Sequence, residues 1–202
     1  MQGAVNRHVS VKADGGHMTR ITTIVLLLGL ILSSRVVEAG ATAPGIAGAT
    51  TGQVEAIAWA IERYAEAGLE LPPLTVIVHP SRDDCDGNRG QYHIVGNVDV
   101  VDLCDTSVPV ILHELAHAWT AHHASEEARA AFLGYVGLDA WSGSDVPYDE
   151  RGTERAAQTM SLCLAERPLT PIDASRYASY LEGYEILTGL TSPRVASTHA
   201  GD

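Results

Sequence analysis

The order of elements along the chain predicts an α+β fold, in which one helix precedes a small sheet and further helices follow it. Three observations support this prediction. Apolar residues recur at helical spacing before residue 68 and in several segments after residue 107. Short apolar runs bounded by proline, glycine or asparagine lie between them, as expected of strands. We expect three strands, or slightly more, packed on the helix that follows.

The first 39 residues have the features of a secretory signal peptide. A twelve-residue apolar run at 21–32 follows three basic residues, and Val37-Glu38-Ala39 suits the end of a cleaved signal. The run is too short to span a bilayer, which disfavours an uncleaved anchor. A signal peptide that begins at Met18 would have an ordinary length, and residues 1–17 would then precede the true start of translation. We expect a secreted or extracytoplasmic protein, released or held at the cell envelope, with no stable membrane span after cleavage.

Residues 40–202 would form the mature protein, and their number suffices for one domain. They carry 9 Arg, no Lys and 23 acidic residues, a net charge of −14. Such a charge opposes binding to nucleic acid and to anionic membrane surfaces. We assign residues 51–190 to a single domain, with a flexible lead-in at 40–50 and a disordered tail at 191–202.

The first elements of the domain are a helix and a strand. Apolar residues share one face over 51–67, and Gly68 follows, so we expect a helix that ends there. The apolar run at 74–78 is flanked by prolines and predicts a buried strand. The polar, glycine-containing segment 81–90 is expected to be a loop.

A hairpin and then helices follow the loop. Strands are expected at 91–95 and 98–103, joined by Gly96-Asn97, which is a typical hairpin turn. The rest of the domain is predicted to be mostly helical around one loop at 139–151. The expected helices span 108–121, 125–136, 153–166 and 173–188.

All three cysteines follow the predicted signal, in a compartment where disulfides persist. Cys85 and Cys104 enclose the hairpin and are the expected pair, and a bond between Cys104 and Cys163 is the alternative. In the favoured pairing Cys163 is left over on a buried helix face. The chain has no C-x-x-C spacing, which disfavours a zinc ion held by cysteines.

The helix predicted over 108–121 contains His113-Glu114-Leu115-Ala116-His117. Residues four apart lie on the same helix face, so both imidazoles can reach one ion. Most other side chains of this helix are apolar, which indicates a buried helix. Buried polar groups need partners, and one metal ion would satisfy both histidines. In the H-E-x-x-H pattern, the histidines bind zinc and the Glu is the general base of hydrolysis.

A catalytic zinc ion usually has three protein ligands and an open position for water. His123 stands where a longer form of the pattern has a third His, but Thr120 replaces the glycine that allows the required turn. Glu154 shares a helix face with small residues, which would let its helix approach the histidines closely. We therefore favour Glu154 over His123. Weaker candidates are Asp139, Asp145 and Asp149.

The pentapeptide, followed by Gly152-Thr153-Glu154-Arg155-Ala156-Ala157, resembles the gluzincin branch of zinc metallopeptidases, and its compact, minimal members in particular. The resemblance covers about residues 54–165. It implies a zincin-like fold and a zinc ion held by His113, His117 and Glu154. It also implies a Tyr or His near the metal that stabilises the transition state. The candidates for that role are Tyr148, His93, Tyr177, Tyr180 and Tyr184.

The resemblance implies a zinc metalloendopeptidase that acts on a peptide or protein, with Glu114 as general base. An extended substrate would bind by strand addition along 98–103, the expected edge of the sheet. One alternative is a zinc hydrolase of non-peptide amides. The others are an inactive zinc-binding or interaction protein of zincin fold, and a structural protein whose histidines bind no metal. The presence of Glu114 argues against a site that only binds metal.

Overall fold

The computed structural model describes residues 45–165 and 174–193, which all lie in one compact unit, Ala39–Asp202. The predicted signal peptide, the predicted helix start at Asp173 and most of the predicted tail lie outside the described residues. None of the described helices has the length and apolar character needed to cross a membrane.

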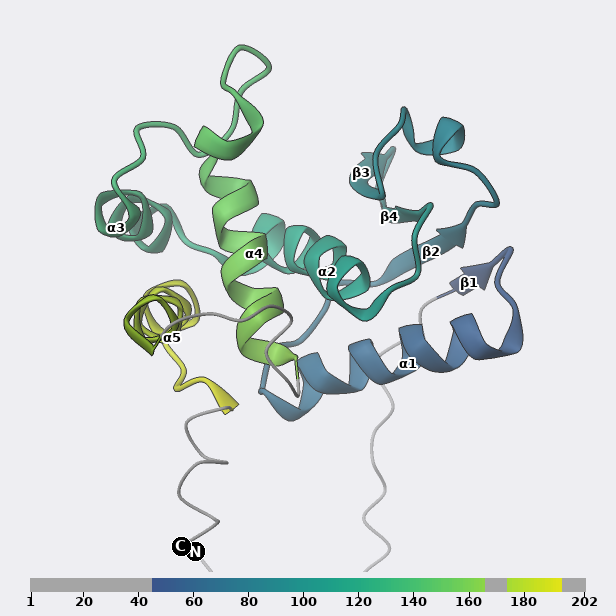
Figure 1. Ribbon diagram of the computed structural model, residues 1–202, viewed down its shortest axis with the longest axis horizontal. Helices are drawn as coiled ribbons and strands as arrows, with labels where there is room; N and C mark the ends of the chain where they lie inside the picture. The colour runs from purple at the N-terminus through teal and green to yellow at the C-terminus, as the bar shows by residue number, and fades with distance from the viewer. Residues whose placement is uncertain (1–44, 166–173, 194–202) are drawn as a thin grey trace, which may run out of the picture. The chain divides into compact units, whose positions relative to one another are not determined.

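A four-stranded mixed sheet forms one layer of this unit, with the strand order β1-β2-β4-β3 (Figure 1). β1 (Gly45–Ala47) and β2 (Leu74–Val78) are parallel, as are β2 and β4 (Val98–Leu103). β3 (Gly90–Val95) pairs antiparallel with β4 through the predicted hairpin turn. The predicted α+β class is confirmed, and the sheet has one strand more than the three that the sequence indicated.

The prediction that 98–103 forms the edge of the sheet was wrong, because β4 lies inside and β3 lies at the edge. The burial of the two strands differs in keeping with this order. Asp99 to Leu103 of β4 are all buried, whereas every residue of β3 is half-buried or exposed.

β1 is the strand that was not predicted, since it falls within the expected flexible lead-in at 40–50. Three residues are too few to show the alternation of apolar and polar side chains that marks a strand. A strand this short forms only by pairing with a neighbouring strand. Here it pairs with β2 from Gly45↔Thr75 to Ala47↔Ile77.

The described helices lie within a few residues of the predicted ranges. α1 (Thr51–Glu66) lies between β1 and β2 along the chain, so the predicted first helix does not precede the whole sheet, and the other helices follow β4. Two short 3-10 turns, η1 (Arg82–Cys85) and η2 (Tyr148–Glu150), form within the predicted loops. The helices after the sheet are α2 (Val108–His123), α3 (Glu126–Val136), α4 (Gly152–Leu164) and α5 (Ala174–Thr188).

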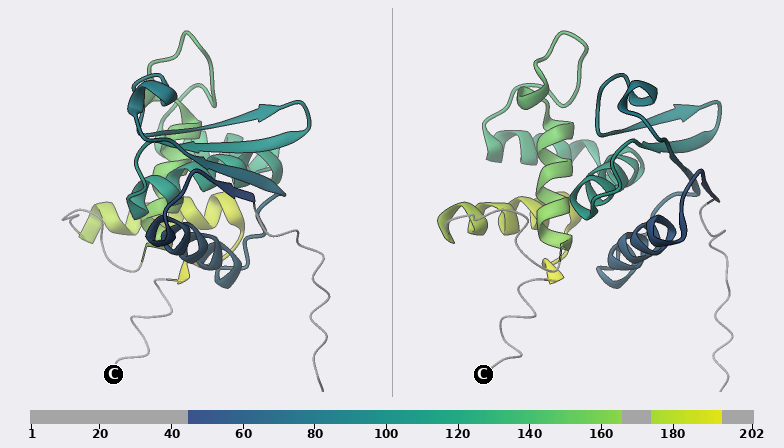
Figure 2. Two further views of the ribbon diagram at one scale, coloured as in Figure 1. Left: turned by 90° about the vertical axis from the view of Figure 1, so that its right-hand side faces the viewer. Right: turned by 45° about the vertical axis from the view of Figure 1, so that its right-hand side comes forward.

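α2 lies at the centre of the packing, as its apolar sequence predicts. Ile111, Leu112 and Leu115 have almost no exposed surface. α1 and α2 lie on the same side of the sheet, and α4 crosses α2 on the side away from the strands (Figures 1 and 2). The helix that carries the H-E-x-x-H residues is therefore enclosed by packing, which fixes its side chains.

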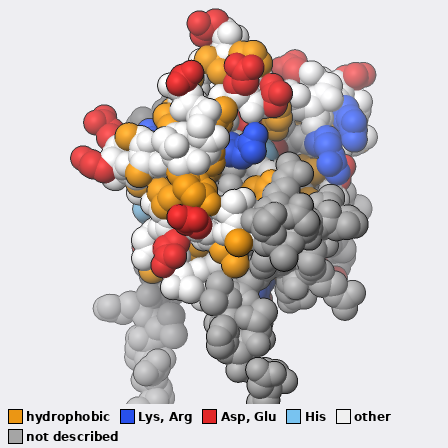
Figure 3. Space-filling view, turned by 60° about the vertical axis from the view of Figure 1, so that its left-hand side comes forward, with side chains coloured by type: hydrophobic (Ala, Val, Ile, Leu, Met, Phe, Trp, Pro, Cys, Tyr) orange, Lys and Arg blue, Asp and Glu red, His pale blue; other side chains and the backbone are white. Residues whose placement is uncertain are grey.

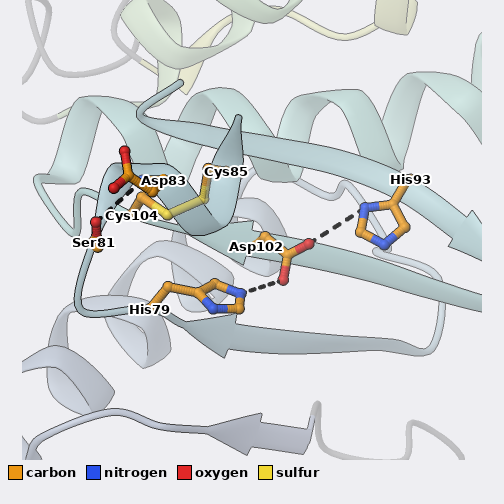
Figure 4. The surroundings of a disulfide bond; sticks show 7 residues. All are labelled: His79, Ser81, Asp83, Cys85, His93, Asp102 and Cys104. Carbon is orange, nitrogen blue, oxygen red and sulfur yellow. Dashed lines mark hydrogen bonds and ion pairs between the residues drawn. A yellow bond between two sulfur atoms is a disulfide. The ribbon is translucent and has the colours of Figure 1, made fainter. Parts of the chain in front are cut away.

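The predicted disulfide between Cys85 and Cys104 is confirmed, and Cys163 is buried and takes no part in it. The bond joins η1 to the end of β4 (Figure 4). The backbone N–H of Cys104 also donates to the carbonyl of Arg89 over 2.9 Å. A crosslink closing a loop of this size stabilises the fold by about 3 kcal/mol. The loop before β3 is thus held against the sheet.

Candidate metal centre

α2 and α4 bring together the side chains of His113, His117 and Glu154. Glu154 Oε2 lies 3.1 Å from His113 Nε2 and 3.4 Å from His117 Nε2, and the two Nε2 atoms are 3.1 Å apart. In a tetrahedral zinc site with ligand bonds of 2.0–2.2 Å, neighbouring ligand atoms are separated by about 3.4 Å. One donor atom from each residue falls within 4.8 Å of the others, so the group can hold a metal ion.

The sequence of α4 explains why Glu154 reaches the histidines. Ala157 and Ser161, which share its face, are buried against the core. Small residues at these positions let the backbone of α4 approach α2 closely. Gly152 begins the helix where a Cβ would lie only 2.7 Å from Leu133 Cδ2. The first turn of α4 is therefore packed tightly, and the Glu154 carboxylate is directed at the two imidazoles.

His123 lies outside this group of donors. α2 continues through Thr120 to His123, so the sharp turn that would bring His123 back toward His117 does not form. The His123 ring instead stacks on Trp119, with 5.4 Å between ring centroids. The weaker candidates Asp139, Asp145 and Asp149 also lie outside the donor group.

Glu154 is held in its ionised form. Burial opposes ionisation, but hydrogen bonds with His113 and His117 outweigh it and, with a smaller contribution from Tyr148, hold the pKa of Glu154 well below its usual range. An ionised carboxylate facing two imidazole nitrogens is the form that binds a cation.

Glu114 is buried beside this group, with 6% of its surface exposed. Burial raises the pKa of Glu114 to about 7; His113 opposes the shift and Glu154 adds to it. A carboxyl group with a pKa near neutrality can both accept and return a proton under ordinary conditions. Glu114 therefore has the properties of a general base.

The raised pKa of Glu114 predicts how the stability of the metal-free protein changes with pH. The folded state binds the carboxyl proton of Glu114 more tightly than the unfolded chain does, where the pKa of this group is 4.5. Ionisation of Glu114 therefore lowers the free energy of unfolding. The loss is absent below pH 4.5 and reaches about 3 kcal/mol above pH 7. We expect metal-free Glu114→Gln to exceed the wild type in free energy of unfolding at pH 8 and to match it near pH 4.5. Urea unfolding with a chelator measures both values, and an equal gain at both pH values would contradict the assignment.

The donor group and Glu114 line a cleft of about 900 Å³. α2 provides its floor, α4 and the segment before it form one wall, and β3 with the preceding loop forms the other. The sequence did not single out Gly90, Tyr92, Arg89 or Arg151 as lining residues. No local pattern marks them, because their place in the cleft depends on how the loop and α4 pack.

Tyr148 is the candidate for transition-state stabilisation that lines the cleft. The residue is 61% exposed, and its hydroxyl lies beside Glu154; partial burial of the hydroxyl, and then this carboxylate, raise the pKa of Tyr148 above its usual range. The hydroxyl therefore keeps its proton and can donate it in a hydrogen bond. His93 instead points at Asp102, with 3.4 Å from Nδ1 to Oδ2 (Figure 4). Tyr184 is fully buried and Tyr180 packs on the core, and the side chain of Tyr177 lies outside the described part of the chain.

Comparison with known proteins assigns no family. No protein-family model, curated protein or solved structure matches the chain. The activity of the protein has to be inferred from its own residues.

Proposed function

We propose that the protein is a secreted zinc metalloendopeptidase of the gluzincin type. The observation that carries this proposal is the approach of Glu154 Oε2 to both His113 Nε2 and His117 Nε2 in one cleft with Glu114. Two His and one Glu are a known donor set of catalytic zinc in hydrolases. The packing of α2 under a small mixed sheet, with the third donor on a later helix, supports a zincin-like fold. The Cys85–Cys104 disulfide supports an oxidising compartment outside the cytoplasm.

The side chains of the cleft then have separate roles in peptide hydrolysis. When bound, zinc lowers the pKa of water and polarises the scissile carbonyl. Glu114 accepts the proton of the attacking water and returns it to the leaving amine. Tyr148 donates a hydrogen bond to the oxygen that becomes negative as the carbonyl is attacked.

An extended substrate fits the edge of the sheet beside this group. β3 is one of the two edge strands, and Gly90, Gln91 and Tyr92 at its start line the cleft. A peptide added as the next strand would run past the donor group with its backbone hydrogen-bonded to β3. β3 thus takes the role that the sequence suggested for 98–103.

Zinc-dependent cleavage of an unfolded protein tests the proposal. The purified protein should degrade reduced, carboxymethylated casein, lose this activity in a chelator, and regain it with one equivalent of zinc. A fully zinc-loaded protein that cleaves neither casein nor a mixed peptide library would refute a peptidase and leave either a zinc hydrolase of non-peptide amides or a protein that only binds metal.

Tyr148→Phe is expected to lower kcat by about 10- to 100-fold with little change in KM, because its hydroxyl acts on charge that develops during the reaction. Tyr135→Phe is a matched control, since that hydroxyl bonds Glu182 and the carbonyl of Ser179 outside the cleft. Steady-state kinetics on a quenched fluorescent peptide measures both variants. Equal kcat values for Tyr148→Phe and the wild type would exclude Tyr148 from the mechanism.

Gly90→Ala is expected to displace Glu114. A Cβ at Gly90 would lie 2.7 Å from Glu114 Cγ and 2.9 Å from Oε1. We expect the variant to bind zinc normally and to lose about 10- to 100-fold in kcat/KM, since small displacements of a reacting group have effects of this size. Gly134→Ala is the control, because a Cβ there meets no atom within 4 Å. An unchanged kcat/KM for Gly90→Ala would show that Glu114 does not need this space.

A further inference from the structure

Two arginines line the cleft, one on each wall. Arg89 directly precedes the edge strand β3, and Arg151 directly precedes α4. The chain as a whole is acidic: it has a net charge of −12, and acidic side chains are scattered over the face shown in Figure 3. Positive charge beside the candidate metal centre therefore runs against the charge of the whole protein.

Arg151 is oriented but not neutralised. Its Nε donates to the carbonyl of Val146 over 2.8 Å, which fixes the direction of the side chain. Within the described ranges it forms no ion pair, and the neighbouring Asp149 and Glu150 are exposed. Its two terminal nitrogens remain available to a ligand. A guanidinium group binds a carboxylate through two parallel hydrogen bonds.

The position of Arg151 places this charge near the reacting groups. It stands three residues before Glu154 and lines the same cleft. Its charge also acts on Tyr148, where it lowers the pKa of the hydroxyl against the larger effect of burial. A ligand held by Arg151 would therefore lie beside Tyr148 and the donor group.

Arg89 on the other wall is partly neutralised. Its Nε and Nη2 lie 2.9 and 2.8 Å from Asp105 Oδ2, and Nη2 also donates to Ser107 Oγ over 3.1 Å. Arg82 Nη2 lies 3.9 Å from the same oxygen, so one carboxylate faces two guanidinium groups. Arg89 adds positive potential to its wall, whereas Arg151 offers the open binding group.

We propose that the cleft selects substrates that carry a carboxylate close to the scissile bond, and that Arg151 binds this carboxylate. The inference rests on the proposed peptidase function and names its substrate class. An Asp or Glu side chain and the C-terminal carboxylate of a peptide share this chemistry. Arg151 is thus a residue that determines specificity, while Glu114 and Tyr148 serve any substrate.

The binding of matched peptides tests this assignment without turnover. The protein is the zinc-loaded Glu114→Gln variant, and its dissociation constants are measured by fluorescence anisotropy at low ionic strength. Three labelled peptides of equal length differ only in charge. The first has an internal Glu and an amidated C-terminus, and the second has Gln instead of this Glu and is also amidated. The third has the same Gln and a free C-terminal carboxylate. We expect one of the two carboxylate peptides to bind about tenfold more tightly than the neutral one. Which of them does so identifies the source of the carboxylate.

Arg151→Gln, introduced into the same protein, should abolish the tenfold preference, and Arg151→Lys should restore part of it because the charge is kept. Arg155→Gln is the matched control, since it makes the same charge change in α4 at a residue that does not line the cleft. Zinc content and thermal unfolding show whether each variant is intact. Equal affinity for all three peptides, or an equal loss for neutral and charged peptides in Arg151→Gln, would overturn the proposal.

Turnover by the wild type separates this inference from the function on which it rests. Cleavage of neutral and carboxylate peptides with the same kcat/KM would refute the selectivity and leave the peptidase intact. Absence of cleavage of every peptide by the zinc-loaded protein would refute the peptidase itself.

Discussion

Glu114→Gln is expected to retain zinc and to lose peptide hydrolysis by about 10³-fold. A general base contributes about 10²- to 10⁴-fold to a reaction of this kind. Gln has nearly the shape of Glu and cannot accept the proton, so the variant removes the chemistry and keeps the packing of a side chain that is 6% exposed. The readouts are kcat/KM on a quenched fluorescent peptide and zinc content after gel filtration.

A surface change of the same kind provides the control for Glu114→Gln. Glu62 on α1 is exposed, so Glu62→Gln should leave both activity and zinc content unchanged. If zinc-loaded Glu114→Gln keeps a third or more of the wild-type kcat/KM, Glu114 is not the general base.

Removing the third donor has the second large expected effect. Glu154→Ala should weaken zinc binding by at least about 100-fold, because it leaves two histidines and removes the one ionised donor of the group. Zinc at 100 times its dissociation constant stabilises a protein by about 2.7 kcal/mol. The variant should therefore also lose most of the zinc-dependent rise in Tm. Competition with a fluorescent zinc chelator and thermal unfolding with and without zinc measure the two effects.

His123→Ala separates the two candidates for the third ligand. The His123 ring stacks on Trp119 and lies outside the donor group, so its removal should leave the zinc affinity within about twofold of the wild type. A large loss of affinity in His123→Ala together with little change in Glu154→Ala would mean that the longer H-E-x-x-H pattern applies after all.

Much of this arrangement can be predicted from local sequence. The apolar surroundings of His113 and His117 place them on a buried helix, and the small residues on the face of Glu154 predict its close packing. Both features are repeated every turn of a helix, so a single sequence shows them. The pairing of Cys85 with Cys104 is also predictable, because the hairpin between them brings its two ends together.

Other features depend on contacts between distant segments and have no local signal. The order of β3 and β4 in the sheet is decided by which strand meets β2, and β1 is too short to show periodicity. In the sequence Gly90 is an ordinary loop glycine, and only the structure shows that a side chain there would collide with Glu114. The choice of Tyr148 among five candidates likewise follows from the packing of η2 beside α4.

The loop at 81–90 illustrates how a polar, irregular segment becomes part of a defined cleft. The disulfide at Cys85 and the hydrogen bond from Cys104 to Arg89 join the middle and the end of this loop to the end of β4. Arg89 and Gly90 are thereby fixed on the cleft wall, one supplying positive potential and the other space for Glu114.

The most direct measurement is a crystal structure of the zinc-loaded protein with anomalous scattering recorded at the zinc edge. We predict one ion at 2.0–2.2 Å from His113 Nε2, His117 Nε2 and a carboxylate oxygen of Glu154, with a water molecule in the fourth position next to Glu114. An ion bound instead through His123, or no anomalous peak between α2 and α4, would contradict the metal centre.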